Sequence, residues 1–436
     1  MTRKGEHTMN ADESIDKILS QIDPQEVIRL TAELVRINSV WDPENGTCEK
    51  PAAEHAARWA EARGFPVQVD EVRPGRPNVV VTFEAAPGER TLMFEGHTDV
   101  VTPGDVSAWT HDPFGAEIVG RRMYGRGAND TKGNLAAMLV AMSALKRSGV
   151  PLKGSIVGGV LCDEEDQMLG VLDFIEKGHA DAVTAAVICE PEDGLICNAQ
   201  KGAIRARFDI TGRMSHGAMP LAGLNTAPAV ARIIDGLQRL EQDAVEKAGM
   251  DPLLGWPSFT PTVIQAPAAG PAQLNVVPGS SRILVDIRTV PAQSHDDIRQ
   301  AVERLAREAA DRTREAYEAY DRTIQADRDP NIKVEVRFIT DRPCTFTDEN
   351  EPVVRAADWA VRKVTGAEPE YGGVPGATDG TFLWACKNIP IVTMGAGDRR
   401  VPHQVDEWVD LDQLVDTARI YALTAWKYLT PENDAS

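Results

Sequence analysis

The sequence has few cysteines, no long apolar run and no excess of basic residues, and each shortage excludes a class of protein. Its 6 cysteines form no Cys-x-x-Cys pair among 436 residues, so we predict buried free thiols rather than a disulfide framework. No apolar stretch reaches the roughly 20 residues that span a bilayer. The segment MTRKGEHTMNADES also lacks the apolar core of a signal peptide. We therefore predict a cytoplasmic protein with no membrane partner.

Acidic residues outnumber basic ones: 66 aspartates and glutamates stand against 46 lysines and arginines, a formal net charge of -20. A chain with this charge repels polyanions, which argues against nucleic acid and anionic membranes as partners. A small anionic substrate held by a local cation remains compatible with it. Histidines are also scarce, with 8 in the chain, so the position of each one is informative.

The length of the chain suggests two domains, because it is too long for a single core. From about residue 76 short apolar runs rich in Val and Ile recur, namely NVVVTF, RTLMFEGH, GSIVGGVLCDEE, AAVICEPE and IPIVTMGAGD. Nearly continuous apolar strands are typical of a sheet covered by helices on both faces. TKGNLAAMLVAMSALKRSG predicts one such helix, ended by Gly149. The alternation predicts an α/β fold with a mixed, mostly parallel sheet flanked by helices.

The first predicted helix has a clear start signal. Asp23 can act as the N-cap, Pro24 fits the first helical position, and Glu26 stands where a capping box needs it. Apolar residues then recur at helical spacing to about Asn38. We therefore predict that the first helix of the chain spans about residues 24–38.

Residues 202–341 have a different pattern. AIRARFDIT, SRILVDIRT and KVEVRFI alternate apolar and polar residues, as half-exposed antiparallel strands do. Two amphipathic helices accompany them, and Ser294 with Asp297 marks the start of the second. The pattern predicts an α+β domain over 202–341, inserted into an α/β domain that comprises 1–201 and 342–436.

Polar side chains follow three of the apolar runs at their C-terminal ends. His97 and Asp99 follow TLMF, Glu164 and Glu165 follow GVLC, and Glu190 follows AVIC. Open parallel sheets place their ligand sites at this edge. We therefore expect these side chains to lie close together.

Two further segments bring an acid and a second histidine to the same edge. GRGANDTKG carries Asp130 at a helix start, and GAGDRRVPHQVDEW carries His403. Converging carboxylates repel one another, and one or two divalent cations relieve that repulsion. Histidine with carboxylate suits Zn²⁺, with Mn²⁺ or Co²⁺ as alternatives, and two metals need a bridging carboxylate. His97 is then a ligand, and Asp99 is the carboxylate that orients it.

Each of these residues also has a structural explanation when taken alone. A Glu-Glu pair is commonly part of a solvated loop, Asp130 could cap a helix, and His403 could lie in a surface loop. Their joint occurrence beside apolar strands and glycine-rich turns favours the metal site.

Seven motifs in register resemble one known family over nearly the whole chain. They are GHTDVV, GRGANDTKG, CDEED, CEPE, SHGAMP, NVVPGSSRILVDIR and VPHQVDEWV. The resemblance is to the dinuclear metallohydrolases that include acetylornithine deacetylase, succinyl-diaminopimelate desuccinylase, aminoacylases and glutamate carboxypeptidases. It implies a catalytic metal-binding domain with an inserted lid and dimerisation domain.

The resemblance also implies roles for the residues at the metal site. One metal would be held by His97 and Glu190, the other by Glu165 and His403, and Asp130 would bridge the two. The general base would be Glu164, next to a ligand, and Asp99 would orient His97. The family further implies a cis peptide bond between Asp130 and Thr131.

For substrate recognition the resemblance implies a homodimer in which His216, from the SHGAMP loop, reaches the partner's site. Asn275 and Arg288, expected on neighbouring strands, would bind the substrate's carboxylate. GATDGTF would place Gly376 and Thr378 at the substrate, and Thr378 stands where serine is frequent, so its methyl group narrows the pocket.

We therefore predict a metal-dependent hydrolase that cleaves a C–N bond in a small carboxylate-bearing molecule. An N-acyl amino acid is the leading substrate, and Glu190, where the family's peptidases often have aspartate, favours a deacylase. The alternatives are an aminohydrolase that removes an amine from an activated aromatic carboxylate, and a di/tripeptidase or carboxypeptidase. A catalytically inactive family member is a further alternative, which the complete set of candidate ligands argues against.

Overall fold

The computed structural model describes residues 10–430. Residues 1–9, most of the segment in which we predict no signal peptide, lie outside the described range. The chain divides into two compact units. Unit 1 comprises Met1–Ala199, Phe346–Val374 and Thr378–Ser436, and unit 2 comprises Gln200–Thr345 and Pro375–Ala377.

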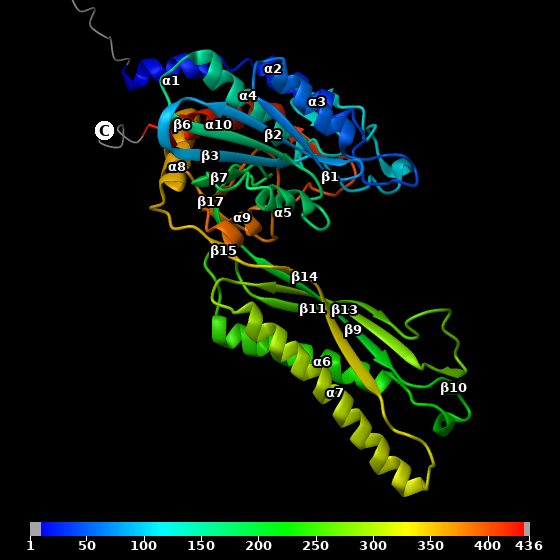
Figure 1. Ribbon diagram of the computed structural model, residues 1–436. Coiled ribbons are helices and arrows are strands. Elements are labelled where there is room, and N and C mark those ends of the chain that lie inside the picture. Colours follow the sequence, from blue (N-terminus) through cyan, green and yellow to red (C-terminus); the bar gives the residue numbers. More distant parts are fainter. Residues whose placement is uncertain (1–9, 431–436) are drawn as a thin grey trace, which may run out of the picture. The chain divides into compact units, whose positions relative to one another are not determined.

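Unit 1 is built on a mixed sheet of nine strands (Figure 1). Their order is β1 (Val67–Arg73), β2 (Arg76–Glu84), β6 (Lys153–Leu161), β3 (Ala86–His97), β7 (Ala185–Ile188), β17 (Ile391–Thr393), β8 (Ile196–Gln200) and β15 (Thr345–Phe346), and β16 (Tyr371–Val374) pairs with β8. The central strands β6, β3, β7 and β17 pair in parallel. Strands β1 and β2 pair antiparallel with their neighbours, and β8 pairs antiparallel with β17. The predicted mixed sheet is confirmed, with its parallel pairs at the centre.

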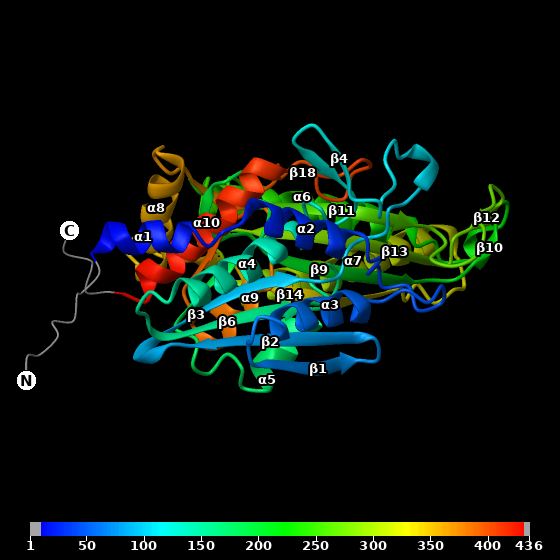
Figure 2. The same cartoon turned by 90° about the horizontal axis from the view of Figure 1, so that it is seen from above.

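Helices cover both faces of this sheet, as Figures 1 and 2 show for unit 1. They are α1 (Ala11–Leu19), α2 (Pro24–Val35), α3 (Lys50–Glu61), α4 (Lys132–Ser148), α5 (Leu169–Glu176), α8 (Pro352–Thr365), α9 (Gly380–Lys387) and α10 (Leu411–Tyr428). Phe94 of β3 packs against Tyr421 of α10 on one face, with ring centroids 5.4 Å apart. Its neighbour Met93 points to the other face and joins a separate core with Phe174 of α5 and Leu383 of α9. Burial on both faces explains why the strand sequences are nearly continuous apolar runs.

The helix α4 matches its prediction, and the helix predicted to begin at Pro24 is present as α2, but it is not the first helix of the described chain. Gly149 ends α4 with φ +61°, a conformation that glycine adopts without strain. The first helix of the described chain is α1, which has a capping box between Asn10 and Glu13 that the sequence analysis missed.

The capping box predicted at the start of α2 is absent. Asp23 does cap α2, where its side chain accepts from the Gln25 amide, but Glu26 forms no capping box. The Glu26 carboxylate instead pairs with Arg63 at 2.7 Å and with Arg147 at 3.0 Å. Two cations, one just after α3 and one in α4, hold this carboxylate more strongly than a single backbone amide does.

Unit 2 is an antiparallel sheet with two helices over one face (Figure 1). Its strand order is β11 (Ser258–Gln265), β13 (Ser280–Thr289), β9 (Gly202–Thr211) and β14 (Lys333–Arg342), and its helices are α6 (Ala227–Ala248) and α7 (His295–Ile324). On β13 the residues Ile283, Val285 and Ile287 are buried under the helices, and the residues between them lie on the other face. This alternation confirms the antiparallel strand pattern that was predicted for the α+β domain.

Three small elements complete the description. A three-stranded sheet in unit 1 contains β18 (Trp408–Asp410), β5 (Arg122–Tyr124) and β4 (Glu117–Val119). In unit 2, β10 (Ser215–His216) pairs with β12 (Val276–Val277). Short 3-10 turns lie at Val106–Ala108 and Pro220–Ala222.

The structure tests two predictions made from composition: buried free thiols and the absence of a membrane-spanning segment. All 6 cysteines are free, as predicted, but only Cys162, Cys189 and Cys197 are buried, and Cys386 is exposed. Between residues 10 and 430 no helix has both the length and the apolar character needed to cross a membrane.

Candidate metal centre

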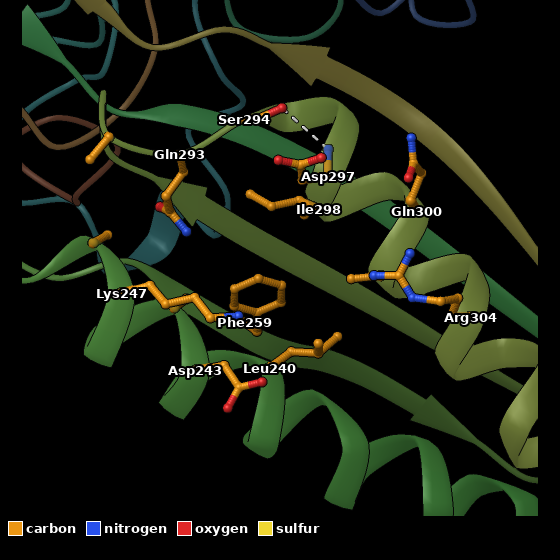
Figure 3. Close-up of a pocket in the computed structure, with 14 residues that line it drawn as sticks. Leu240, Asp243, Lys247, Phe259, Gln293, Ser294, Asp297, Ile298, Gln300 and Arg304 are labelled. Atoms are coloured by element: carbon orange, nitrogen blue, oxygen red, sulfur yellow. Dashed lines mark hydrogen bonds between the residues drawn. The ribbon is translucent and has the colours of Figure 1, made fainter.

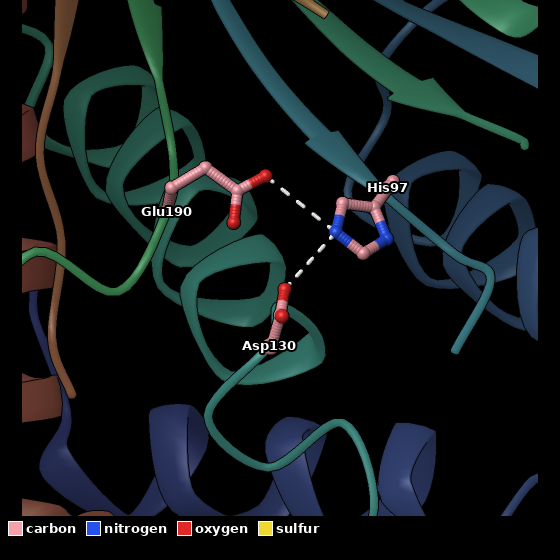
Figure 4. Close-up of side chains that lie close together, drawn as sticks. All are labelled: His97, Asp130 and Glu190. Carbon is pink, nitrogen blue, oxygen red and sulfur yellow. Dashed lines mark hydrogen bonds and ion pairs between the residues drawn. The ribbon is translucent and has the colours of Figure 1, made fainter. Parts of the chain in front are cut away.

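The first group of candidate ligands joins His97, Asp130 and Glu190 (Figure 4). His97 is the last residue of β3, and Glu190 follows β7 closely. Because β3 and β7 are parallel neighbours, their C-terminal ends lie at the same edge of the sheet. His97 Nε2 lies 3.3 Å from Asp130 Oδ1 and 3.5 Å from Glu190 Oε1. The three side chains therefore converge from two strand ends and from the loop before α4.

The second group joins Asp130, Glu165 and His403. His403 Nε2 lies 3.3 Å from Asp130 Oδ2 and 2.9 Å from Glu165 Oε1. In each group the ligand atoms all lie within 4.8 Å of one another. Asp130 thus directs one carboxylate oxygen to each group. The Asp130–Thr131 peptide bond is cis, as the resemblance implied.

The hydrogen bonds of His97 define which of its nitrogens faces the acids. Nδ1 lies 3.0 Å from the backbone carbonyl oxygen of Asp99, an atom that can only accept, so Nδ1 carries the hydrogen. Nε2 is then unprotonated in the neutral ring and points at Asp130 and Glu190. This is the arrangement in which a histidine binds a metal through one nitrogen and is oriented through the other.

The Asp99 carboxylate has a second task that the sequence analysis did not predict. It lies 3.5 Å from His97 Nδ1, and it also accepts from the backbone amides of Glu164 and Glu165, at 3.2 and 3.0 Å. Asp99 therefore links the strand that carries His97 to the loop that carries the two glutamates.

Three buried residues that the sequence analysis missed hold the other side of that loop. Asp163, just before Glu164, has φ +66° and forms an ion pair with Arg76 at 2.5 Å. The Arg76 guanidinium also bonds to Glu49. No metal-site motif contains Arg76 or Glu49, so their role becomes visible only in three dimensions.

Burial and mutual repulsion dominate the electrostatics of the acids. Burial raises the pKa of Glu164 and of Glu190 well above the usual value, and burial together with Asp130 raises that of Glu165. Burial also acts to raise the pKa of Asp130, but hydrogen bonds from the two histidines outweigh it and lower that pKa. Bonds to Asp130 and Glu165 raise the pKa of His403 to about 10. The acids are thus crowded in a way that favours a positive charge among them.

The residues present fit divalent cations. Glu190 Oε1 is buried and, within the described chain, has no hydrogen-bond partner, although it faces the His97 ring. Burial acts to lower the pKa of His97, but Glu190, Asp130 and Asp99 together raise it well above the usual value. A divalent cation bound between these side chains would give the buried Glu190 oxygen a partner and would offset the negative charge of the acids. Histidine with carboxylate is the donor set of Zn²⁺ and related metals.

The remaining predicted site residues lie in or beside unit 2. His216 lies in β10 and Asn275 just before β12; both are exposed, and the Gly217 amide donates to the Asn275 carbonyl oxygen at 2.6 Å. Arg288 lies near the far end of β13, and its guanidinium bonds to Asp286 at 2.6 and 3.2 Å. Arg288 is therefore held in an ion pair with Asp286.

The expectation that Asn275 and Arg288 lie on neighbouring strands is wrong. Asn275 precedes β12, which belongs to a separate two-stranded sheet, and Arg288 lies in the four-stranded sheet. The eight residue-to-residue steps from Ser280 to Arg288 along β13 span about 26 Å at ~3.3 Å per step. Proximity in sequence was misleading because the chain runs the length of an extended strand between them.

Gly376 and Thr378 lie at a point where the chain passes between the units. Gly376 belongs to unit 2 and Thr378 to unit 1. Thr378 is buried, and its hydroxyl accepts from the Gly380 amide at 3.3 Å.

A cavity of about 480 Å³ in unit 2 is separate from the predicted site (Figure 3). It lies between α6 and α7 above Phe259, and none of its lining residues is a predicted site residue. Its charged residues are of both signs: Asp243, Lys247, Asp297 and Arg304. The cavity offers no set of metal ligands, so the metal chemistry belongs to the sheet edge of unit 1.

Comparison with known proteins identifies the family. The model of the peptidase family M20/M25/M40 matches residues 93–427. The chain belongs to this family. The matched range contains all the candidate ligands, and the resemblance found in the sequence is confirmed.

Individual relatives agree with this assignment. The succinyl-diaminopimelate desuccinylase of Cereibacter sphaeroides is 30% identical over 419 residues, which cover 93% of this chain and 100% of that protein. The structure of an M20-family metallo-carboxypeptidase from Sulfolobus solfataricus has a TM-score of 0.74 and 18% identity, and covers 92% of this chain and 99% of its own. A dinuclear metal-binding peptidase of the family from Bacillus subtilis has a TM-score of 0.64 and 16% identity, with coverages of 93% and 98%. The chain is therefore a metal-dependent hydrolase that acts on C–N bonds, as predicted.

Proposed function

We propose that this chain is a cytoplasmic deacylase that hydrolyses the amide bond of a small N-acyl amino acid, with two divalent cations as cofactors. Zn²⁺ is the first choice, and Mn²⁺ or Co²⁺ would substitute for it. The observation that carries the proposal is Asp130, whose two carboxylate oxygens each face a separate group of ligands. The acyl group is supported by the 30% identity to a desuccinylase.

In this proposal His97 and Glu190 would hold one cation, Glu165 and His403 would hold the other, and Asp130 would be shared by both. When bound, the cations act as Lewis acids that polarise the amide carbonyl and make water acidic enough to react near neutral pH. Glu164 accepts the proton of the attacking water at its carboxylate and delivers it to the leaving nitrogen.

Asp99 supports this proton transfer by holding the loop that carries Glu164. Its carboxylate accepts from the Glu164 and Glu165 amides, and its carbonyl orients His97. One residue thereby fixes the general base relative to a ligand of each cation. Proton transfer is efficient only when the base is held within hydrogen-bonding reach, so this linkage is a condition of the mechanism.

A substrate screen on the metal-loaded enzyme tests the proposal. The panel contains N-succinyl and N-acetyl amino acids, dipeptides, tripeptides and aromatic amino-carboxylates, with products identified by mass. Release of a free carboxylic acid and an amino acid from the N-acyl compounds is the expected result. Ammonia released without an acid fragment would identify the aminohydrolase instead, and exclusive cleavage of peptides would identify a peptidase.

Dimerisation is part of the proposal, with His216 and Asn275 acting together on the partner's site. The support is their adjacency at the β10–β12 pair, where both are exposed. We expect His216→Ala and Asn275→Ala each to lower kcat/KM by at least about tenfold, because each removes a polar contact to the reacting substrate. Mixing inactive His216→Ala with inactive Glu164→Gln should then restore activity, since hybrid dimers carry one complete site.

The matching control mixes His216→Ala with Asn275→Ala. If one subunit supplies both His216 and Asn275 to its partner's site, each site of the hybrid lacks one of the two residues. No activity should then return. Recovery in this control would show that one of the two residues acts in trans and the other in cis. No recovery in the first mixture, after subunit exchange is demonstrated, would contradict the trans role of His216.

Arg288 is proposed to bind the substrate's carboxylate, for which it must share or exchange its bond with Asp286. The guanidinium binds carboxylates in a two-pronged, directional way. Arg288→Ala should therefore lower kcat/KM for a free-acid substrate by about 30- to 1,000-fold, equivalent to about 2–4 kcal/mol. For the corresponding amide substrate the loss should be much smaller.

Arg282 provides the matched control for this measurement. It lies on the same face of β13 and pairs with Asp209 at 3.1 Å in the way that Arg288 pairs with Asp286. Arg282→Ala should leave the ratio of acid to amide activity unchanged. An equal loss on acid and amide substrates in Arg288→Ala would show that Arg288 does not read the carboxylate.

A further inference from the structure

A buried glutamate joins the two loops that supply Asp130 and His403. Glu407 follows His403 by four residues and is fully buried. Its Oε1 accepts from the backbone amides of Gly127, Asn129 and Asp130, at 3.0, 3.0 and 3.1 Å. Three amides that converge on one oxygen form a concave anion site, which the chain fills with its own side chain.

The charge of Glu407 is balanced within the same cluster. Its Oε2 pairs with Arg126, which is 1% exposed and lies over the Trp109 ring at 5.3 Å. A buried carboxylate is stable only when it is paired and hydrogen-bonded, and Glu407 meets both conditions.

A second set of contacts packs the two loops together at their other end. Asn129 Nδ2 donates to the Asp398 carbonyl oxygen at 2.9 Å. Gly397 has φ +117°, and a Cβ there would overlap the Asn129 side chain. These contacts set the loops side by side, but the contact to the Asp130 amide itself comes from Glu407.

The two candidate ligand groups are therefore supported differently. His97 ends β3 and Glu190 follows β7, and these two strands are hydrogen-bonded to each other in the sheet. Asp130 and His403 lie in loops, and His403 has a side chain that is 51% exposed. The group of Asp130, Glu165 and His403 thus depends on loop contacts for its geometry.

We propose that Glu407 is a positioning residue that holds the loop of Asp130 against the loop of His403 and so sets the affinity of one metal site more strongly than that of the other. The inference rests on the proposed dinuclear centre and goes beyond it, since Glu407 contacts neither the ligand atoms nor the substrate. Its loss weakens the site of Asp130, Glu165 and His403 most, because two ligands of that site lie in the linked loops, and it weakens the site of His97, Asp130 and Glu190 less, because only Asp130 of that group does.

The test is metal binding, measured without substrate. Chelator-treated wild type and Glu407→Gln are titrated with Zn²⁺ and with Co²⁺ by calorimetry, and the visible spectrum of Co²⁺ is recorded at each step. We expect two equivalents in wild type. In Glu407→Gln one equivalent should bind about 10- to 100-fold more weakly, the usual effect of losing a residue that orients ligands, and the other should change by less than about threefold.

Asp321→Asn controls for the general loss of a buried ion pair. Asp321 and Arg328 form a two-bond pair in unit 2, at 2.7 and 2.9 Å, with side chains 7% and 5% exposed. This variant should lower the melting temperature without changing either metal affinity. Glu407→Asp, which keeps the charge for Arg126 but is shorter by one methylene group, serves if Glu407→Gln does not fold, and it should weaken the same equivalent.

A double variant assigns the effect to one site. His403→Ala alone should retain a single equivalent, and adding Glu407→Gln should not weaken it by more than about threefold. If both equivalents weaken by similar factors in Glu407→Gln, or if neither does while the melting temperature falls, Glu407 has only a structural role. If wild type itself binds fewer than two equivalents, the dinuclear centre fails instead.

Discussion

Replacing Glu164 by glutamine is expected to lower kcat by about 100- to 10,000-fold while both metal equivalents are retained. Glutamine has nearly the same shape as glutamate, but its amide cannot accept a proton from the attacking water. The Glu164 backbone amide would still donate to Asp99, so the loop keeps its position. KM should change little, because the lost step is proton transfer rather than substrate binding.

Steady-state kinetics and metal analysis on the same preparation check this result. Asp166→Asn is the matched control, since Asp166 is an exposed acid of the same loop and has no assigned role. It should retain most of the activity. If Glu164→Gln loses metal in proportion to activity, Glu164 is a ligand rather than the base, and full activity in Glu164→Gln would remove it from the mechanism.

The convergence of His97, Glu190 and Asp130 could be predicted from the sequence for a physical reason. Parallel strands buried on both faces leave nearly continuous apolar runs, and their C-terminal ends share one edge. A histidine or carboxylate just after such a run is therefore placed by the sheet itself. His403 could not be placed in this way, because its loop comes from the far end of the chain, and the motif resemblance supplied it.

Supporting residues were harder to predict, because their partners are distant in sequence and leave no local pattern. Glu407 and Arg126 both lie within motifs that were noticed, yet no spacing rule says that one carboxylate collects three backbone amides of another loop. The prediction for Asn275 and Arg288 was wrong for the opposite reason. The two residues are close in sequence and were expected to be close in space, but an extended strand separates them. The strand predicted from SRILVDIRT separates Asn275 from Arg288, which lies near the strand's end, and the strand's extended length was the signal that the two residues lie far apart.

Replacing Asp130 by asparagine should have the largest effect of all, because Asp130 is the one residue common to both ligand groups. Its Oδ1 lies 3.3 Å from His97 Nε2 and its Oδ2 lies 3.3 Å from His403 Nε2. Asparagine keeps one neutral oxygen and replaces the other by an amide nitrogen that cannot bind a cation. We expect a metal content below one equivalent and a loss of kcat/KM of at least about 10,000-fold, equivalent to ~5.5 kcal/mol of transition-state stabilisation.

The matched comparison uses variants of two ligands that each belong to only one of the two groups. His97→Ala and His403→Ala should each retain about one equivalent, because the other group keeps its complete set. Chelator treatment of wild type should reproduce the activity loss of Asp130→Asn, and Zn²⁺, Mn²⁺ or Co²⁺ should restore activity to wild type but not to the variant. Two equivalents retained in Asp130→Asn would mean that the carboxylate is not shared. The two ligand groups would then be independent sites, and water could not be activated between them, since a bridging carboxylate is what holds two metals at the ~3.5–4 Å spacing that this chemistry needs.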